Sequence, residues 1–156
     1  MFLMLPGCSR SPCKEHLEKH VNGRLKRAGK ICDGLKQGRW LEDYAEGALR
    51  WQGTYVNDTL DMHPPKDSTE IHVSFLTGDL RVGKEAQVRI QVSDIHPSSF
   101  TVEVENGTIA PPGDPDMYDQ VITPASPGLL VMRFAWTDPR TGMRQVLGER
   151  RFPVSE

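Results

Sequence analysis

The sequence predicts an all-β protein in two parts, a stacked β-hairpin repeat followed by a β-sandwich. Three observations lead to this prediction. The 14 Gly and 12 Pro of the 156 residues are spread along the chain as turn signals, which favours many short strands over long helices. Residues 14–62 carry an internal repeat, and residues 67–156 carry short runs of alternating apolar and polar residues.

The first segment, residues 1–13, is expected to be a membrane tether. Leu5-Pro6-Gly7-Cys8 resembles a bacterial lipobox, in which the cysteine receives lipid, so Cys8 is the predicted attachment site. A secretory signal needs a basic start and about 7–15 apolar residues, and the residues before Cys8 are few and contain no basic side chain. A cytosolic protein with an apolar N-terminus, or a natural start upstream of Met1, therefore stays open.

The other two cysteines predict a disulfide. If Cys8 carries lipid, Cys13 and Cys32 remain, and an even remainder in an oxidising compartment favours their pairing. Closing a loop of this size stabilises a folded chain by about 3 kcal/mol.

An offset of 24 residues aligns residues 14–38 with residues 38–62. Equivalent positions then hold Gly23, Leu25, Gly29 and Ile31 against Gly47, Leu49, Gly53 and Tyr55, and His16 and His20 against Trp40 and Tyr44. This alignment predicts repeated β-hairpins that turn at Glu46-Gly47 and Asn57-Asp58. A single hairpin cannot bury its own face, so the units must associate.

The aromatic side chains of the repeat are the candidate binding residues. Even spacing places Trp40 and Tyr44 on one strand face, and Gly53 leaves space for a neighbouring ring. We expect Trp40, Tyr44, Trp51 and Tyr55 to exceed what two hairpins bury, which makes them candidates for a partner-binding surface because interface cores favour aromatic residues. The alternative is that these rings form only the packing of the repeat itself.

Residues 38–49 and Gly53-Thr54-Tyr55 resemble the MORN-repeat variant of YwqK-like proteins, over roughly residues 14–60. The resemblance implies a module that associates with proteins or membranes and brings no catalytic residues. Some relatives are labelled antitoxins, which gives an alternative function as a cytosolic binding protein that acts through the repeat face.

Two groups of residues carry side chains of the kinds that bind metal ions. His16 and His20 have the spacing of two ligands on a helix, but the repeat alignment predicts strand positions where they pack or lie on the surface. Asp114, Asp116 and Asp119 cluster in an expected loop with oxygen ligands that suit Ca²⁺, although the spacing fits no EF-hand loop. We predict no metal and no cofactor, and leave a cation at the aspartates open.

Pro64-Pro65 marks the predicted boundary before the second part. Residues 67–156 resemble the immunoglobulin-like modules of bacterial surface and periplasmic proteins, without their cysteine pair. Asn106-Gly107 predicts a tight turn, residues 128–137 a central strand, and Gly148 a bend in the last strand. The expected strands are residues 70–77, 86–93, 99–105, 118–123, 128–137 and 144–154.

Charge and motifs narrow the function. Residues 1–66 carry 11 Lys/Arg against 8 Asp/Glu, and residues 67–156 carry 8 against 13, so neither part has the basic patch of a nucleic-acid-binding protein. The sequence lacks a G-x-S-x-G elbow, an activated cysteine and a Gly-rich phosphate loop. We therefore expect no enzyme but an envelope lipoprotein, an adaptor or structural subunit that binds a protein partner and is lipid-anchored in the outer membrane or periplasm. A carbohydrate- or ion-binding sandwich is a further alternative.

Overall fold

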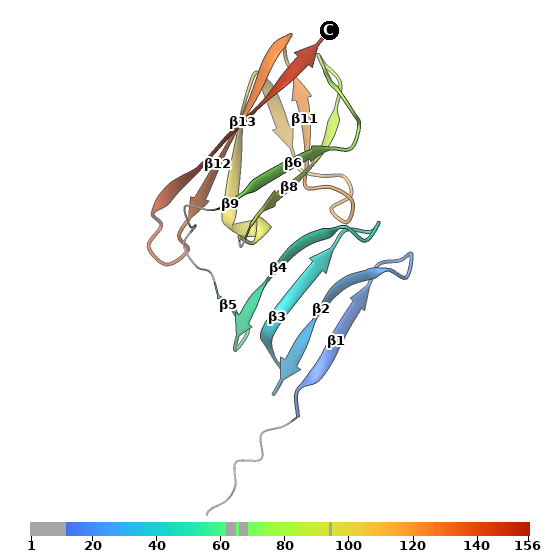
Figure 1. Ribbon diagram of the computed structural model, residues 1–156, viewed down its shortest axis with the longest axis vertical. Coiled ribbons are helices and arrows are strands. Elements are labelled where there is room, and N and C mark those ends of the chain that lie inside the picture. Colours follow the sequence, from blue (N-terminus) through green and yellow to red (C-terminus); the bar gives the residue numbers. More distant parts are fainter. Residues whose placement is uncertain (1–11, 62–64, 66–68, 94) are drawn as a thin grey trace, which may run out of the picture.

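The structure, a computed structural model, describes residues 12–61, 65, 69–93 and 95–156. The predicted lipid site Cys8 lies outside these residues, and so does Pro64, the first residue of the predicted Pro64-Pro65 boundary. The fold is all-β, as predicted, and consists of one five-stranded sheet and two four-stranded sheets (Figure 1). Within the described part of the chain, no helix combines the length and the apolar character needed to cross a bilayer.

The five-stranded sheet, here called the N-terminal sheet, is antiparallel throughout and has the strand order β1-β2-β3-β4-β5. Its hairpins lie edge to edge in one sheet, in the lower half of Figure 1. Its strands are β1 (Lys14–Lys19), β2 (Leu25–Cys32), β3 (Leu35–Asp43), β4 (Leu49–Val56) and β5 (Thr59–Leu60).

The hairpin turns repeat with the 24-residue period that the sequence predicts. The His20 N–H donates to the Arg24 carbonyl at 2.8 Å, and 24 residues later the Tyr44 N–H donates to the Ala48 carbonyl at 2.8 Å. The third residue after each donor is a glycine with positive φ, 83° at Gly23 and 93° at the equivalent position. In both hairpins the pairing register shifts just before the turn, between Glu18 and Lys19 and between Glu42 and Asp43. The two hairpins therefore share one backbone geometry.

The glycines of the repeat make room for indole rings. A Cβ atom at Gly29 would overlap the Trp40 ring, and a Cβ atom at Gly53 would overlap the Trp51 ring. His16 pairs across the strands with Gly29, as Trp40 pairs with Gly53, so the equivalence in the alignment holds in the register. The prediction that Gly53 accommodates an aromatic side chain is confirmed.

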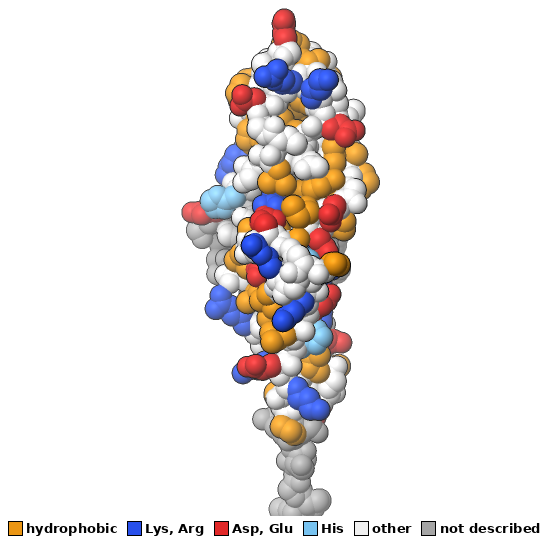
Figure 2. Space-filling view, turned by 90° about the vertical axis from the view of Figure 1, so that its right-hand side faces the viewer, with side chains coloured by type: hydrophobic (Ala, Val, Ile, Leu, Met, Phe, Trp, Pro, Cys, Tyr) orange, Lys and Arg blue, Asp and Glu red, His pale blue; other side chains and the backbone are white. Residues whose placement is uncertain are grey.

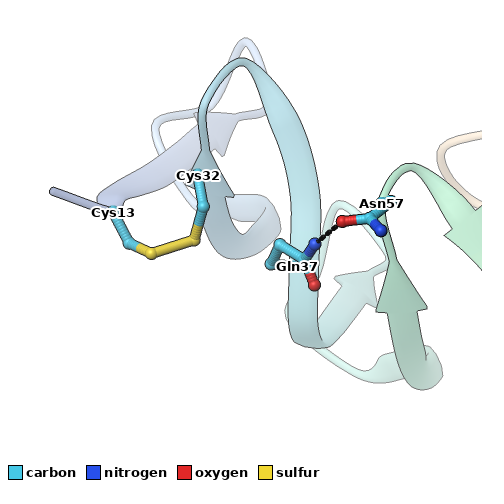
Figure 3. Close-up of a disulfide and its surroundings, with 4 residues drawn as sticks. All are labelled: Cys13, Cys32, Gln37 and Asn57. Carbon is cyan, nitrogen blue, oxygen red and sulfur yellow. Dashed lines mark hydrogen bonds between the residues drawn. A yellow bond between two sulfur atoms is a disulfide. The ribbon is translucent and has the colours of Figure 1, made fainter. Parts of the chain in front are cut away.

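A disulfide joins Cys13 to Cys32, with a Cα–Cα distance of 4.2 Å, at the open end of the first hairpin (Figure 3). At the open end of the second hairpin, the Gln37 side-chain amide donates to the Asn57 side-chain oxygen (Figure 3). The disulfide therefore fastens the start of β1, the outermost strand, to the end of β2.

Breaking this disulfide should destabilise the N-terminal sheet. We expect Cys13→Ser/Cys32→Ser to lower the free energy of unfolding by about 3 kcal/mol, because the unfolded chain regains the entropy that the closed loop removes. Urea unfolding followed by tryptophan fluorescence measures the loss. Adding a reductant to the wild type should reproduce it, and an unchanged midpoint in reductant would contradict the prediction.

The remaining strands form two sheets packed face to face, here called the sandwich. One sheet has the order β10-β11-β8-β6 and the other β7-β13-β12-β9. Their strands are β6 (Ile71–Phe75), β7 (Leu80–Arg81), β8 (Ala86–Val92), β9 (Phe100–Glu105), β10 (Gly107–Ala110), β11 (Gln120–Pro124), β12 (Gly128–Thr137) and β13 (Arg144–Ser155), with a 3₁₀ turn η1 (Pro97–Ser99) before β9.

The core of the sandwich lies between the two sheets and draws alternate residues from them, as the period-2 pattern requires. β12 is an inner strand, as predicted, and Leu130, Met132 and Phe134 are fully buried. The core consists of Ile71, Leu80, Ala86, Val88, Ile90, Val92, Ile95, Ile122, Leu130, Met132, Phe134, Trp136 and Val154.

Two details of the sandwich bear on the sequence predictions. Gly148 has φ 145° and sits at a register shift between β12 and β13, which confirms the predicted bend. Asn106 does turn the chain, with φ 65°, but β9 and β10 do not pair as a hairpin. The tight turn predicted at Asn106-Gly107 is therefore present, and the chain crosses there from one sheet to the other.

Candidate functional site

The loop between β10 and β11 connects the sandwich to the N-terminal sheet. The Ala45 N–H donates to the Asp116 carbonyl at 2.8 Å, and the Asp116 carboxylate lies 3.1 Å from Lys26 Nζ and 3.3 Å from His20 Nδ1. Burial raises the pKa of Asp116, but the hydrogen bonds from Lys26 and His20 outweigh it and hold that pKa below its usual value. The carboxylate is therefore ionised at neutral pH and fixes this loop to the first hairpin turn.

Asp119 is the centre of the contact between the two parts, and only 9% of it is exposed. Its carboxylate accepts hydrogen bonds from the Tyr44 hydroxyl at 2.5 Å, from Arg50 Nε at 3.1 Å and from the Ile90 N–H at 2.8 Å. These donors come from the end of β3, from β4 and from β8. One buried side chain thus joins both parts of the protein.

Tyr44 is enclosed between two arginines. The guanidinium carbons of Arg89 and Arg50 lie 4.4 Å and 5.6 Å from the Tyr44 ring centroid. Arg89 also forms an ion pair with Glu46 and donates to the Met117 carbonyl at 2.7 Å. Burial and the hydrogen bond to Asp119 raise the pKa of Tyr44, so its hydroxyl remains a donor at all physiological pH values. Here "the joint" means Tyr44, Glu46, Arg50, Arg89 and Asp119.

Three of the four candidate binding rings are buried inside the protein, which agrees with the alternative that they serve internal packing. Trp40, Tyr44 and Trp51 are 1%, 0% and 5% exposed, and Tyr55 is half-buried. The rings pack over the repeat glycines and edge-to-face on one another, and His96 of the sandwich covers Trp51 with ring centroids 4.5 Å apart. They hold the protein together and do not form an open binding surface.

A cleft of about 820 Å³ lies between the ring-bearing face of the N-terminal sheet and the sandwich edge formed by β9 and β10. Both strands are edge strands of their sheets. The cleft is lined by Arg27, Lys36, Glu42, Arg50 and Tyr55 from the N-terminal sheet, and by Ile90, His96, Pro97, Ser98, Phe100, Thr101, Val102, Ile109, Ala110, Pro111, Asp119 and Gln120 from the sandwich.

The charges around the cleft favour an anionic group. Glu42 is already paired with Arg27 at 2.7 Å, and Asp119 with Arg50 at 3.0 Å. Lys36 lies over the Tyr55 ring at 4.7 Å and adds a third cation. The sandwich side of the cleft adds apolar groups, among them the partly buried Phe100, Val102 and Ile109, beside polar side chains such as Thr101 and Gln120. The arrangement suits a ligand that has apolar side chains and a carboxylate.

His96 makes the contact between Trp51 and the cleft sensitive to pH. Burial is the main cause that lowers the pKa of His96, and the nearby cations Arg50, Arg27 and Lys36 lower it further. The carboxylate of Glu42 raises the pKa but does not compensate, so the pKa lies below its ordinary value of about 6.5. Because the folded state disfavours the protonated ring, the stability present above about pH 6.5 should be lost as pH falls through the folded pKa.

We expect His96→Gln to reduce this part of the pH dependence of unfolding, measured by urea titrations between pH 7.5 and pH 5. His72→Gln is the matched control, because His72 is exposed on β6 with a side-chain exposure of 64%. Equal slopes in the two variants would contradict the role of His96.

The predicted metal candidates do not converge. Asp119 faces Tyr44 and Arg50, Asp116 faces His20 and Lys26, and Asp114 accepts the Asp116 N–H within its own turn. Among the described residues no group of three or more His, Cys, Asp or Glu side chains is placed to hold a metal ion. His16 lies on β1 against the Trp40 ring, so the strand position predicted for it is confirmed.

Sequence reasoning missed the joint. Arg50 and Arg89 belong to no sequence motif, Asp119 stands out only as one of three loop aspartates, and 69 residues separate Arg50 from Asp119. One sequence signal for burial of Asp119 was present: it lies beside Tyr118 at the start of an apolar strand, and Tyr118 is buried.

Comparison with protein-family models, curated proteins and solved structures finds no match to this chain.

Proposed function

We propose that this protein is a non-enzymatic bacterial envelope lipoprotein that binds a protein partner as an adaptor or structural subunit of a larger complex. Lipid on Cys8 would anchor it in the outer membrane or at the periplasmic face. The MORN-like character of residues 14–62 and the immunoglobulin-like character of residues 67–156 belong to the same proposal, as modules that bind and position other proteins.

The disulfide between Cys13 and Cys32 is the observation that carries the location. Disulfides persist in oxidising compartments such as the periplasm and are rare in the cytosol. The pair also leaves Cys8 as the remaining cysteine, within the lipobox-like Leu5-Pro6-Gly7-Cys8. The alternative of a cytosolic YwqK-like antitoxin has weaker support for the same reason.

The cleft supports the binding role. It is bordered by the edge strands β9 and β10, which can add an extended segment of another chain by backbone hydrogen bonds. The two carboxylates of the cleft, Glu42 and Asp119, are already paired with arginines, which suits binding better than proton transfer. Lys36, the cation of the cleft beyond these two ion pairs, would meet an acidic side chain of that segment, and the apolar groups of the cleft would take the alternate side chains.

The anchor is tested by metabolic labelling with palmitate and by fractionation. We expect the wild type to incorporate label and sediment with membranes, and Cys8→Ser to lose label and appear in the soluble fraction, since the acyl chains supply the membrane affinity. Ser9→Ala is the neighbouring control. Membrane association that survives Cys8→Ser would reject the anchor.

The cleft is tested by a photo-cross-linking residue at Ala110, which is exposed and lines the cleft. In cells we expect a discrete adduct from position 110 and none from Val146, which is 70% exposed on β13 outside the cleft. Lys36→Glu should abolish the adduct by reversing the charge that meets the acidic segment. Equal adducts at both positions, or an adduct indifferent to Lys36→Glu, would reject the cleft as the binding site.

A further inference from the structure

Among the described strands, β1 leaves one backbone edge of the N-terminal sheet unpaired. It is hydrogen-bonded to β2 on one side, and it forms the outer edge of the sheet in Figure 1. The disulfide at Cys13 fastens the start of this strand, and the hairpin turn after His20 fastens its end. β1 is therefore a fixed edge, in contrast to β5 at the opposite side of the sheet, which has two residues.

The hairpin turn determines which residues of β1 direct their backbone groups outward. His20 uses both its N–H and its C=O inside the hairpin, with Arg24 and Gly23. Backbone direction alternates along a strand, so Lys19, Leu17 and Glu15 point their N–H and C=O groups away from β2. The register shift in this hairpin adds its extra residue to β2, and β1 keeps its alternation.

The side chains of β1 complement a second copy of the same strand. In an antiparallel pair centred on Leu17, Leu17 meets Leu17 of the second copy, Glu15 meets its Lys19, and His16 meets its Glu18. The Leu17 pair is apolar and the Glu15–Lys19 pairs are opposite in charge, whereas Glu18 already lies near Lys26 and Arg27 of its own chain. Of the two adjacent allowed registers, the one centred on His16 would place the Glu15 carboxylate opposite the apolar Leu17, and the one centred on Glu18 would place two Glu18 carboxylates opposite each other. Opposite charges across strands stabilise a pair by about 0.2–1 kcal/mol each.

Exposure along β1 agrees with such a contact. Leu17 is 63% exposed, and Glu15 and Lys19 on the same face are exposed. Figure 2 views the molecule from the side on which β1 lies and shows Lys/Arg and Asp/Glu side chains interspersed over this part of the surface. Charges on an edge strand usually block pairing with foreign strands, and here the same charges attract their own copy in one register.

We propose that this protein self-associates through β1, which pairs antiparallel with β1 of a second copy about a two-fold axis at Leu17. The two N-terminal sheets then form one continuous sheet, and the contact is isologous. The sandwich lies in the upper half of Figure 1, away from the β1 edge. The proposal is independent of the lipid anchor and of the cleft.

Charge exchange between Glu15 and Lys19 provides the decisive experiment. Glu15→Lys places Lys opposite Lys at both ends of the contact, and Lys19→Glu places Glu opposite Glu, so each single variant should lose self-association. Mixing the two variants should restore one-to-one dimers, because every pair is again opposite in charge. Sedimentation equilibrium of the purified full chain at low salt, with native mass spectrometry of the mixture, measures both effects.

Glu70→Lys, an exposed charge reversal outside β1, should dimerise like the wild type. The proposal is overturned by single variants that dimerise like the wild type, or by a mixture that gains no heterodimer. Neither result would depend on whether Cys8 carries lipid, so failure here is distinct from failure of the proposed function.

A cysteine at the axis gives a second readout that does not require charge effects. Cα atoms of directly opposed residues in an antiparallel hydrogen-bonded pair lie about 5.5 Å apart, within the range of a disulfide. In a Cys8→Ser background, we expect Leu17→Cys to form a covalent dimer under mild oxidation. Val21→Cys, more exposed but past the end of β1, should remain monomeric. Equal cross-linking at both positions would indicate random collision and overturn the proposed contact.

Discussion

Replacing Asp119 by alanine should lower the free energy of unfolding by about 3–5 kcal/mol, as expected when one partner of a buried ion pair is removed. The variant loses the acceptor for the Tyr44 hydroxyl, for Arg50 and for the Ile90 N–H at once. The hydroxyl of Tyr44, which is 0% exposed, is then left without its partner in the interior. The loss should therefore exceed that of a single surface ion pair several-fold.

Chemical unfolding in urea, followed by tryptophan fluorescence, measures this loss. Asp114→Ala is the matched control in the same loop: its carboxylate accepts one N–H in an exposed turn, so we expect a loss of about 0.5–1.5 kcal/mol. Tyr44→Phe removes one donor and keeps the ring between the arginines, and should fall between the two. A loss for Asp119→Ala no larger than that for Asp114→Ala would contradict the central role of the joint.

The same variant should uncouple the two parts of the protein. Trp40 and Trp51 report on the N-terminal sheet and Trp136 on the sandwich core. With all three tryptophans kept, the wild-type joint should make the transitions followed by tryptophan fluorescence and by far-ultraviolet circular dichroism coincide. With Asp119→Ala, we expect the transition of the N-terminal sheet to move to lower urea than that of the sandwich.

The repeat could be predicted from the sequence because its determinants are local. Gly23 and Gly47 need positive φ for their turns, and Gly29 and Gly53 need the absence of a Cβ, so the same residue types recur at the same spacing. The strands of the sandwich were predictable for a similar reason, since alternation with a period of two reflects burial of one strand face.

The short parallel strand β7 and the joint were not predictable in this way. β7 consists of Leu80–Arg81 and pairs with the end of β13, some 74 residues away in the sequence. Two residues show no periodicity, and only tertiary contact makes them a strand. The joint likewise depends on three segments that meet only after both parts have folded.

The sequence left open what covers the aromatic rings, because two hairpins alone cannot bury them and part of their cover comes from a distant segment. In the protein, a glycine beneath each indole lowers the ring into the sheet, and His96 from η1's N-terminal end covers Trp51. The N-terminal sheet and the sandwich thus bury each other's apolar surface. What remains accessible between them is the cleft, with its apolar groups on the sandwich side.

Trp40→Ala should be the most destabilising substitution in the N-terminal sheet, with a loss of about 3–5 kcal/mol. The ring is 1% exposed and contacts His16 on β1 and Tyr55 on β4, at centroid distances of 5.5 Å and 5.8 Å. Removing it leaves a cavity that the flanking strands, held by their backbone hydrogen bonds, cannot close. Urea unfolding at pH 7.5, followed by far-ultraviolet circular dichroism, avoids the loss of a fluorescent reporter.

Substitutions at Gly29 test whether the missing Cβ at this position makes room for the Trp40 ring. In the wild type, Gly29→Ala should cost about 1–3 kcal/mol, because its Cβ would overlap the Trp40 ring and force it out of place. In the Trp40→Ala background the same methyl group enters the cavity, so Gly29→Ala should cost little or restore some stability. The double-mutant cycle should therefore give a coupling energy of at least about 1 kcal/mol between the two positions.

Gly53→Ala with Trp51→Ala should give a coupling of the same sign, because Gly53 lies against Trp51 as Gly29 lies against Trp40. Gly23→Ala is the control for backbone strain alone: its φ is 83° and no atom lies near an added Cβ, so its cost should not change when Trp40 is removed. If the losses in free energy of unfolding are additive at both glycine–tryptophan pairs, the glycines are needed for backbone conformation and not to make room for the indole rings.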